Sequence, residues 1–343
     1  MPGSVWAGLA ERGLRVAGDQ PESGLPPAAQ RRMAEIRSSG TWGSALSTAE
    51  FAAIRSVGFE PVGQVLGAAV YNVGFSGGYY CPGAWGSGGW GSGGLGGGLL
   101  RGTPWQSPTE VSGRGGAASF GPLVQTMYEA RRKALGRMTA ECEQLGGHGV
   151  VGVSLDIGPF PAGGLEFKAI GTAVRAPGAV YPAAPFTSHL SGQDFAKLIM
   201  SGWVPAALVL GISIGARHDD WMTVGQTRWS SGNAEVTGYT ELVNASRHDA
   251  RVQLERDARG HGADAVVTSR MELRLREREC PAQEGSRDHI AEATFVGTAI
   301  ARFGRRPDPG MPEAGEARGA PVPIAALSLD PQRRQAARVR LGR

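Results

Sequence analysis

Hydrophobic and polar positions along the chain form two series of elements in the same order. Residues 46–74 are patterned as a short helix, a Gly-x-x-Pro turn and a strand. Residues 190–218 repeat this pattern at an offset of 144 (190 − 46 = 144). The coinciding residues include Phe51 and Phe195, Gly58 and Gly202, Pro61 and Pro205, and Gly67 and Gly211.

A long amphipathic helix and two strands follow in each series. One apolar face at helical spacing carries Met127, Ala134, Met138, Cys142 and Leu145, and it predicts a helix that ends at Gly146. We therefore expect Cys142 to be a buried thiol that fills core space. Residues 239–263 repeat the helix at an offset of 116 (266 − 150 = 116). The strands "VVGVSLDI" and "LEFKAIGTAVRA" are matched by "AVVTSRMEL" and "IAEATFVGTAIARF".

These patterns predict an α+β fold built from two tandem copies of one helix–strand–helix–β-hairpin unit. The first copy spans 46–178 with an insertion at 72–121, and the second spans 186–304. Residues 1–45 read as a partly disordered extension with a short helix at Pro27–Arg37, and 305–343 as a flexible tail rich in Arg and Pro. Each small unit leaves strand edges that need partners, so we expect the sheets to continue between the subunits of a homo-oligomer.

The segments that join helix to strand resemble a known family. "LGGHGVVGV" with "IGTAV" in the first copy, and "HGADAVVTS" with "VGTAI" in the second, are similar to the YbjQ-like family of heavy-metal-binding domains. Thr268 replaces the glycine that follows Val-Val in the family pattern. The resemblance implies small α+β subunits in rings, typically pentamers. With two copies per chain, the copies would alternate around one ring or form two layers, and five chains in two layers is the preferred count.

Composition and charge exclude several classes of protein. The net charge is +4 and the arginines are scattered, which does not favour a nucleic-acid partner. Three cysteines far apart form no disulfide framework and favour a reducing, cytoplasmic location. The uncharged stretch Leu198–Gly215 contains Pro205 and aligns with the polar Glu60 and Gln64 of the first copy, so we expect no membrane span. No nucleophile elbow or phosphate-binding loop is present, so we expect no enzyme.

Several residues are candidate ligands for a divalent or soft metal ion. They are Cys81, His148, His218, Asp219 and Asp220. His148 is matched by Asp264 in the second copy, so it could instead bond loop backbone, and residues 218–220 could instead be a solvated charged loop.

The insertion at 72–121 combines many glycines with aromatic residues. Tyr79, Tyr80, Trp85, Trp90 and Trp105 could dock a partner or a neighbouring subunit, or the segment could be a tolerated flexible loop. The main functional expectation is a non-enzymatic, oligomeric binding protein for a heavy metal or a small ligand. The alternative is a structural scaffold or interaction protein that docks a partner through 72–121.

Overall fold

The protein has a mixed α+β fold, as the sequence predicts. The computed structural model describes residues 25–72, 107, 109–114, 120–160, 164–176, 182, 184–280, 285–302 and 326–328. Cys81 and the five aromatic residues proposed for partner docking lie outside these residues.

The first half of the chain forms a helix, a strand, a long helix and a β-hairpin in that order. These elements are α3 (Thr48–Ser56), β1 (Glu60–Asn72), α4 (Gly121–Gln144), β3 (Gly149–Phe160) and β4 (Gly164–Arg175). The strands lie in the order β1-β4-β3-β5, where the neighbours β1, β4 and β3 are antiparallel and β5 (Phe186–Thr187) is parallel to β3. Before them, α2 (Pro27–Ser39) forms the short helix expected near Pro27–Arg37.

The second half repeats this order of elements. They are α5 (Gly192–Met200), β6 (Trp203–His218), α7 (Thr237–Gly260), β7 (Ala265–Glu279) and β8 (Arg287–Arg302). Their sheet has the order β2-β6-β8-β7-β9, completed at its edges by β2 (Glu110–Val111) and β9 (Ala326–Ser328). The short helix α6 (Trp221–Gln226) and single 3-10 turns at Ser112–Arg114 and Trp229–Ser231 lie in the connections.

The same local chemistry shapes both halves. Ser47 caps α3 by accepting from Glu50 N, and Ser191 caps α5 by accepting from Asp194 N. Each of these helices ends in a turn whose glycine has a positive φ, 85° at Gly58 and 77° at Gly202. That conformation favours glycine, which explains the Gly-x-x-Pro pattern before each strand.

Packing contacts also recur at the offsets found in the sequence. A Cβ on Gly67 would lie 1.9 Å from Ala134 O, and a Cβ on Gly211 would lie 2.0 Å from Ala250 O. Each long helix therefore lies against the first strand of its own half at a glycine. Other recurring pairs are Trp42 stacked on Phe51 and Phe186 on Phe195, and the hydroxyl contacts Ser44–Thr172 and Ser188–Thr298.

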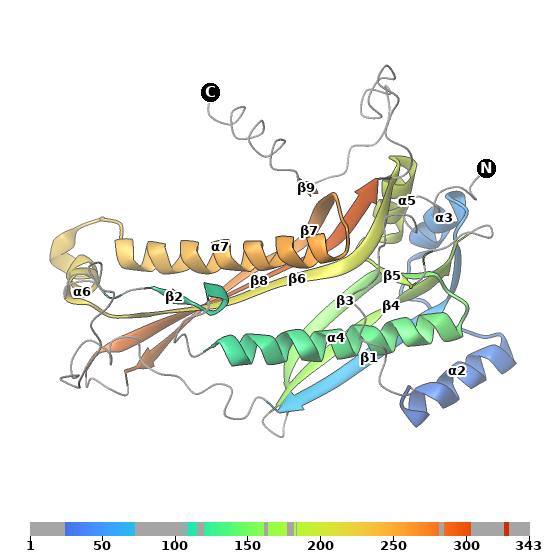
Figure 1. Ribbon diagram of the computed structural model, residues 1–343, viewed down its shortest axis with the longest axis horizontal. Helices are drawn as coiled ribbons and strands as arrows, with labels where there is room; N and C mark the ends of the chain where they lie inside the picture. Colours follow the sequence, from blue (N-terminus) through green and yellow to red (C-terminus); the bar gives the residue numbers. More distant parts are fainter. Residues whose placement is uncertain are drawn as a thin grey trace, which may run out of the picture.

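The strand β6 is buried on both faces, whereas β1 alternates between buried and more exposed positions. Leu208, Leu210 and Ile212 belong to the core that includes α4. Val209, on the other face, belongs to the core of α7, and Figure 1 shows these two helices on opposite sides of β6 and β8. Burial on both faces explains the continuous apolar run in 198–215, which consists of the end of α5 and most of β6. Among the described residues, no helix is long and apolar enough to cross a membrane.

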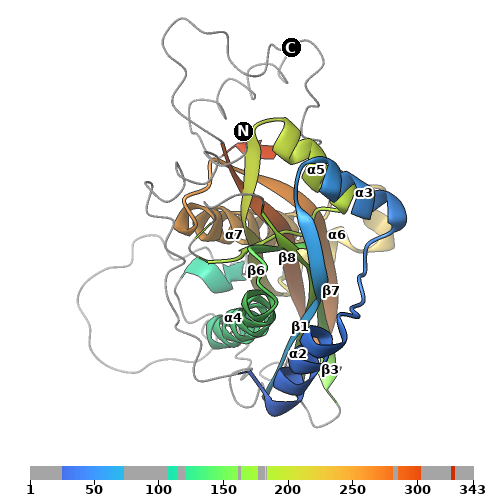
Figure 2. The ribbon, with the colours of Figure 1, turned by 90° about the vertical axis from the view of Figure 1, so that its right-hand side faces the viewer.

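The two halves are joined near the short helices. α3 and α5 lie side by side at one end of the molecule (Figure 2), where Glu50 Oε1 accepts from Gly192 N at 3.3 Å. Beside them β5 adds to the edge of β3, with Gly149 opposite Phe186. A segment of the second half thus completes the sheet of the first half.

Candidate functional site

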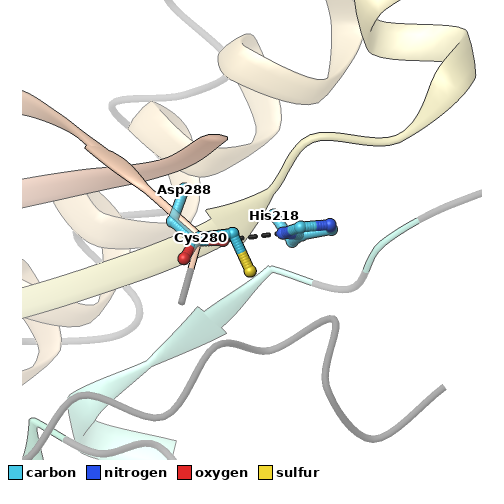
Figure 3. A group of neighbouring side chains, drawn as sticks. All are labelled: His218, Cys280 and Asp288. Carbon is cyan, nitrogen blue, oxygen red and sulfur yellow. Dashed lines mark hydrogen bonds and ion pairs between the residues drawn. The ribbon is translucent and has the colours of Figure 1, made fainter. Parts of the chain in front are cut away.

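Three residues that could bind a metal ion, His218, Cys280 and Asp288, lie together at the end of the second sheet where β6 ends. Figure 3 shows their side chains. His218 is the last residue of β6 and pairs in register with Asp288 of β8, while Cys280 directly follows β7. One ligand atom from each residue lies within 4.8 Å of those of the other two. All three residues are buried.

Within this group, His218 Nδ1 and Asp288 Oδ1 form a hydrogen bond of 2.7 Å. Such a bond fixes the ring orientation and explains how the imidazole and the carboxylate lie buried together. An imidazole, a thiolate and a carboxylate are also three donors that a borderline cation such as Zn²⁺ accepts, and a tetrahedral site would need a fourth ligand.

The structure does not bring His218, Asp219 and Asp220 to one point, although they are consecutive. Asp219 Oδ1 instead accepts from Tyr239 OH at 3.1 Å and lies 2.9 Å from His289 Nε2. Burial, and then the charge of Asp219, raise the pKa of Tyr239. Successive residues of an extended chain point to opposite sides, so neighbours in sequence enter different networks.

Asp220 is a helix cap. Its carboxylate accepts from Thr223 N at 2.7 Å at the start of α6 and pairs with Arg217 Nη2 at 3.0 Å. Burial alone would raise the pKa of Asp220, but the backbone hydrogen bonds from Thr223 and Ser107, together with Arg217, hold it below its usual value. These contacts already engage both carboxylate oxygens.

His148 bonds loop backbone, as the alternative interpretation of this residue anticipates. Its Nδ1 accepts from Ala176 N at 3.0 Å, which ties the start of β3 to the end of β4. Burial, followed by the charge of Arg175, lowers the pKa of His148. Among the proposed ligands that the structure describes, only His218 therefore belongs to the three-residue group.

Sequence reasoning missed Cys280 and Asp288 as neighbours of His218. They flank the turn between β7 and β8, which is longer than the turn between β3 and β4 in the first half. That length was the available signal. The register that places Asp288 opposite His218 is set by the pairing of β6 with β8, which joins residues 70 positions apart (288 − 218 = 70).

The expected burial of Cys142 is confirmed. The side chain is 0% exposed, and its Sγ lies 3.4 Å from Gly149 O. Burial raises the pKa of this thiol to about 12. It fills core space between α4 and the first sheet.

A cavity of about 310 Å³ lies where the halves meet. It is lined by residues 152–155 of β3 and by His189, Ser269, Arg270 and Val296. Burial lowers the pKa of His189 to about 4, so this imidazole is neutral at physiological pH.

Large apolar side chains are exposed on the strands themselves. Met271 and Leu275 on β7 are 68% and 61% exposed, and Val70 on β1 is 48% exposed. Trp221 and Trp229, at and after α6, are 66% and 101% exposed. Exposed apolar side chains that gather on one strand are typical of contact surfaces.

The comparisons with known proteins give one family model and one curated relative. The family model described as "Putative heavy-metal-binding" (YbjQ_1) matches residues 114–177, which span α4, β3 and β4. The encapsulin nanocompartment protein Rv1762c of Mycobacterium tuberculosis is 33% identical over 258 residues, covering 71% of this chain and 82% of the relative. No solved structure matches the chain.

The relative corrects the main functional expectation. Its name describes a nanocompartment protein. The prediction that this chain is a binding protein for a heavy metal or small ligand is therefore wrong. The alternative prediction of a structural scaffold or interaction protein is favoured. Physically, the residue types that suggested a metal are engaged in a His–Asp pair, a helix cap and a loop bond. The extent and identity of the match show that the chain belongs to the family of the encapsulin nanocompartment protein Rv1762c, and it carries a YbjQ-like segment in its first half.

Proposed function

We propose that this chain is a non-enzymatic structural protein that assembles with further copies of itself into a nanocompartment. The observation that carries the proposal is the 33% identity to a nanocompartment protein over 82% of that relative. We further propose that the two halves are tandem copies of one YbjQ-like unit, because the order of elements and the glycine contacts recur in both.

The exposed surface supports an assembling protein. Met271, Leu275 and Val70 put apolar area on strands that lie toward the edges of the two sheets. Burying apolar surface contributes about 25 cal/mol per Å², so such side chains favour association. A closed ring, with the halves alternating or in two layers of five chains, would leave fewer open edges than a single chain. We place the assembly in the cytoplasm, where Cys142 and Cys280 stay reduced.

Light scattering after size-exclusion chromatography tests this function. We expect a mass that is a large multiple of 35.7 kDa and closed particles in negative-stain electron micrographs. A single species of 35.7 kDa at micromolar concentration would contradict the proposal.

We also propose that the aromatic insertion contacts a partner or a neighbouring subunit. Replacing Tyr79, Tyr80, Trp85, Trp90 and Trp105 by serine should lower the mass of the assembly or release a bound protein. An unchanged assembly with unchanged composition would rule out docking through 72–121.

A further inference from the structure

We propose that copies of this chain join head to tail by repeating the interface that already joins its two halves, so that the second half of one copy docks on the first half of the next. The inference rests on the proposed self-assembly and deepens it by naming the surfaces that a second copy covers.

The internal interface begins with an added strand. Phe186 N donates to His148 O at 3.2 Å and Ser188 N donates to Val150 O at 2.9 Å, while Val153 N donates back to Ser188 O at 2.8 Å. Phe186, Thr187 and Ser188 are all buried by this contact. The segment before α5 thus continues the sheet of the first half.

The helix α4 makes the second part of the interface. Arg131, only 4% exposed, donates to Leu208 O and pairs with Asp257 Oδ2 at 2.9 Å. One turn earlier, Tyr128 OH accepts from Ile212 N at 2.9 Å. A helix of the first half thereby satisfies the outer edge of β6 in the second half.

The second half of the chain does not cover the corresponding surface of the first half. Trp42–Leu46 corresponds to Phe186–Leu190 at the offset of 144, yet Gly43, Ser44 and Ala45 are exposed. On β1, Val70 is 48% exposed, whereas its counterpart Ile214 is 5% exposed in the core beside α4. We call Trp42–Leu46 together with Gln64–Val70 the tail surface.

The first half likewise does not cover the complementary surface of the second half. Met271 is 68% exposed, whereas Leu155, its counterpart at the offset of 116, is 8% exposed and packs in the core shared with the second sheet. Arg247 is exposed, whereas its counterpart Arg131 is buried at the internal interface. We call Met271, Arg247 and the β7 edge Ala265–Val267 the head surface.

The charged groups of the two surfaces are complementary. Glu141 accepts from Leu66 N at 2.7 Å on β1, just as Asp257 accepts from Leu210 N at 3.0 Å on β6. Asp257 is paired with Arg131 of the other half, so by the same geometry Glu141 would pair with Arg247 of a neighbouring copy. The carboxylate and the guanidinium are thus on complementary surfaces.

The ends of the chain occupy these places in the single copy. Arg32 of α2 pairs with Glu141, and Met33 is fully buried in the same core. At the other surface, β9 pairs with Ala265–Val267, which corresponds to the edge of β3 that receives Phe186–Thr187. We infer that α2 and β9 cover the tail and head surfaces and move aside when copies join.

Two exposed substitutions test the proposal. Met271→Glu blocks the head surface and Val70→Glu blocks the tail surface, while each leaves the other surface intact. We expect each variant alone to remain at 35.7 kDa, and an equimolar mixture to give a species of twice that mass and no larger one. Only the intact head of one variant can meet the intact tail of the other.

Met200→Glu is the matched control. Met200 is 67% exposed, and its counterpart in the first half, Ser56, is exposed although it lies beside the internal interface. By the same geometry, Met200 stays exposed when copies join. It should assemble as the wild type does. If the wild type assembles and either blocking variant assembles equally well, or their mixture stays monomeric, the head-to-tail contact is overturned while self-assembly stands. A wild type that stays at 35.7 kDa contradicts both the proposed self-assembly and this contact.

Discussion

The close approach of α7 to β6 at Gly211 predicts a large loss of stability on adding one methyl group. A Cβ at this position would lie 2.0 Å from Ala250 O and 2.9 Å from Leu254 N. Both atoms belong to the helix backbone, so no rotamer change relieves the clash in Gly211→Ala. An ordinary contact begins near 3.4 Å, so α7 must retreat by about 1.4 Å (3.4 − 2.0).

The retreat has a cost that can be estimated. A gap of about 0.5–1 Å already forfeits roughly a quarter to a half of the dispersion energy of the atoms along it. Leu242, Ala250, Leu254 and Ala258 are buried on α7 and would lose contacts together. Overpacked cores lose about 1–3 kcal/mol and occasionally more, so we expect a loss of about 3 kcal/mol. In a folded unit of about 150–250 residues, a loss of about 3 kcal/mol lowers Tm by about 6–12 °C.

Thermal and urea denaturation followed by circular dichroism measure this loss. Gly67→Ala should cost about as much, because its Cβ would lie 1.9 Å from Ala134 O in the first half. Gly158→Ala is the matched strand control, since a Cβ there meets nothing within 4 Å. Ordinary surface substitutions change the free energy of unfolding by about 0.5 kcal/mol or less. If the free energies of unfolding of Gly211→Ala and Gly158→Ala differ by no more than that, α7 does not lie as close to β6 as described.

Three further predictions concern buried polar groups. Because burial raises the pKa of Cys142 to about 12, this thiol should react with a disulfide reagent at pH 8 only as fast as the chain unfolds. Rapid labelling of Cys142 in the native protein, measured by mass spectrometry, would contradict its burial. Burial lowers the pKa of His189 from 6.5 to about 4, so the unfolded chain takes up the proton more readily than the folded one. The full free energy of unfolding is therefore present above pH 6.5, and up to about 3 kcal/mol of it should be lost as the pH falls towards 4. His189→Asn should flatten that part of the stability profile, and an equal slope in the variant would exclude His189 as its source. Arg131→Met should lower the free energy of unfolding in urea by about 1–3 kcal/mol, because it leaves the carboxylate of Asp257 and Leu208 O without this partner. An unchanged midpoint would show that the pair does not hold the halves together.

Local patterns in the sequence predict much of the fold. The runs Val150–Leu155 and Val266–Leu273 are strands, and the apolar face through Met138 and Cys142 is buried on a helix. Gly58 and Gly202 mark turns that require a positive φ. These features depend on neighbours within a few residues, and hydrophobic spacing reports such neighbours directly.

The candidate site was less accessible from sequence. His218 was proposed with its neighbours Asp219 and Asp220, but the structure places it beside Asp288 and Cys280, which lie 70 and 62 positions away (288 − 218 and 280 − 218). The register of three strands decides that grouping. A sequence alone carries no direct record of register between distant strands.

The contrast between Gln64 and Leu208 separates what the sequence determined from what tertiary structure decided. The polar residue on one strand and the apolar residue at the same place on the other determine that β1 has an open face and β6 has two covered faces. They do not say what covers the second face of β6. The tertiary structure decides that α4 of the first half covers this face, with Arg131 bonded to the strand edge. The physical reason is that the tendency of a residue to be buried depends on its own side chain, whereas the identity of the element that covers it depends on how the whole chain packs.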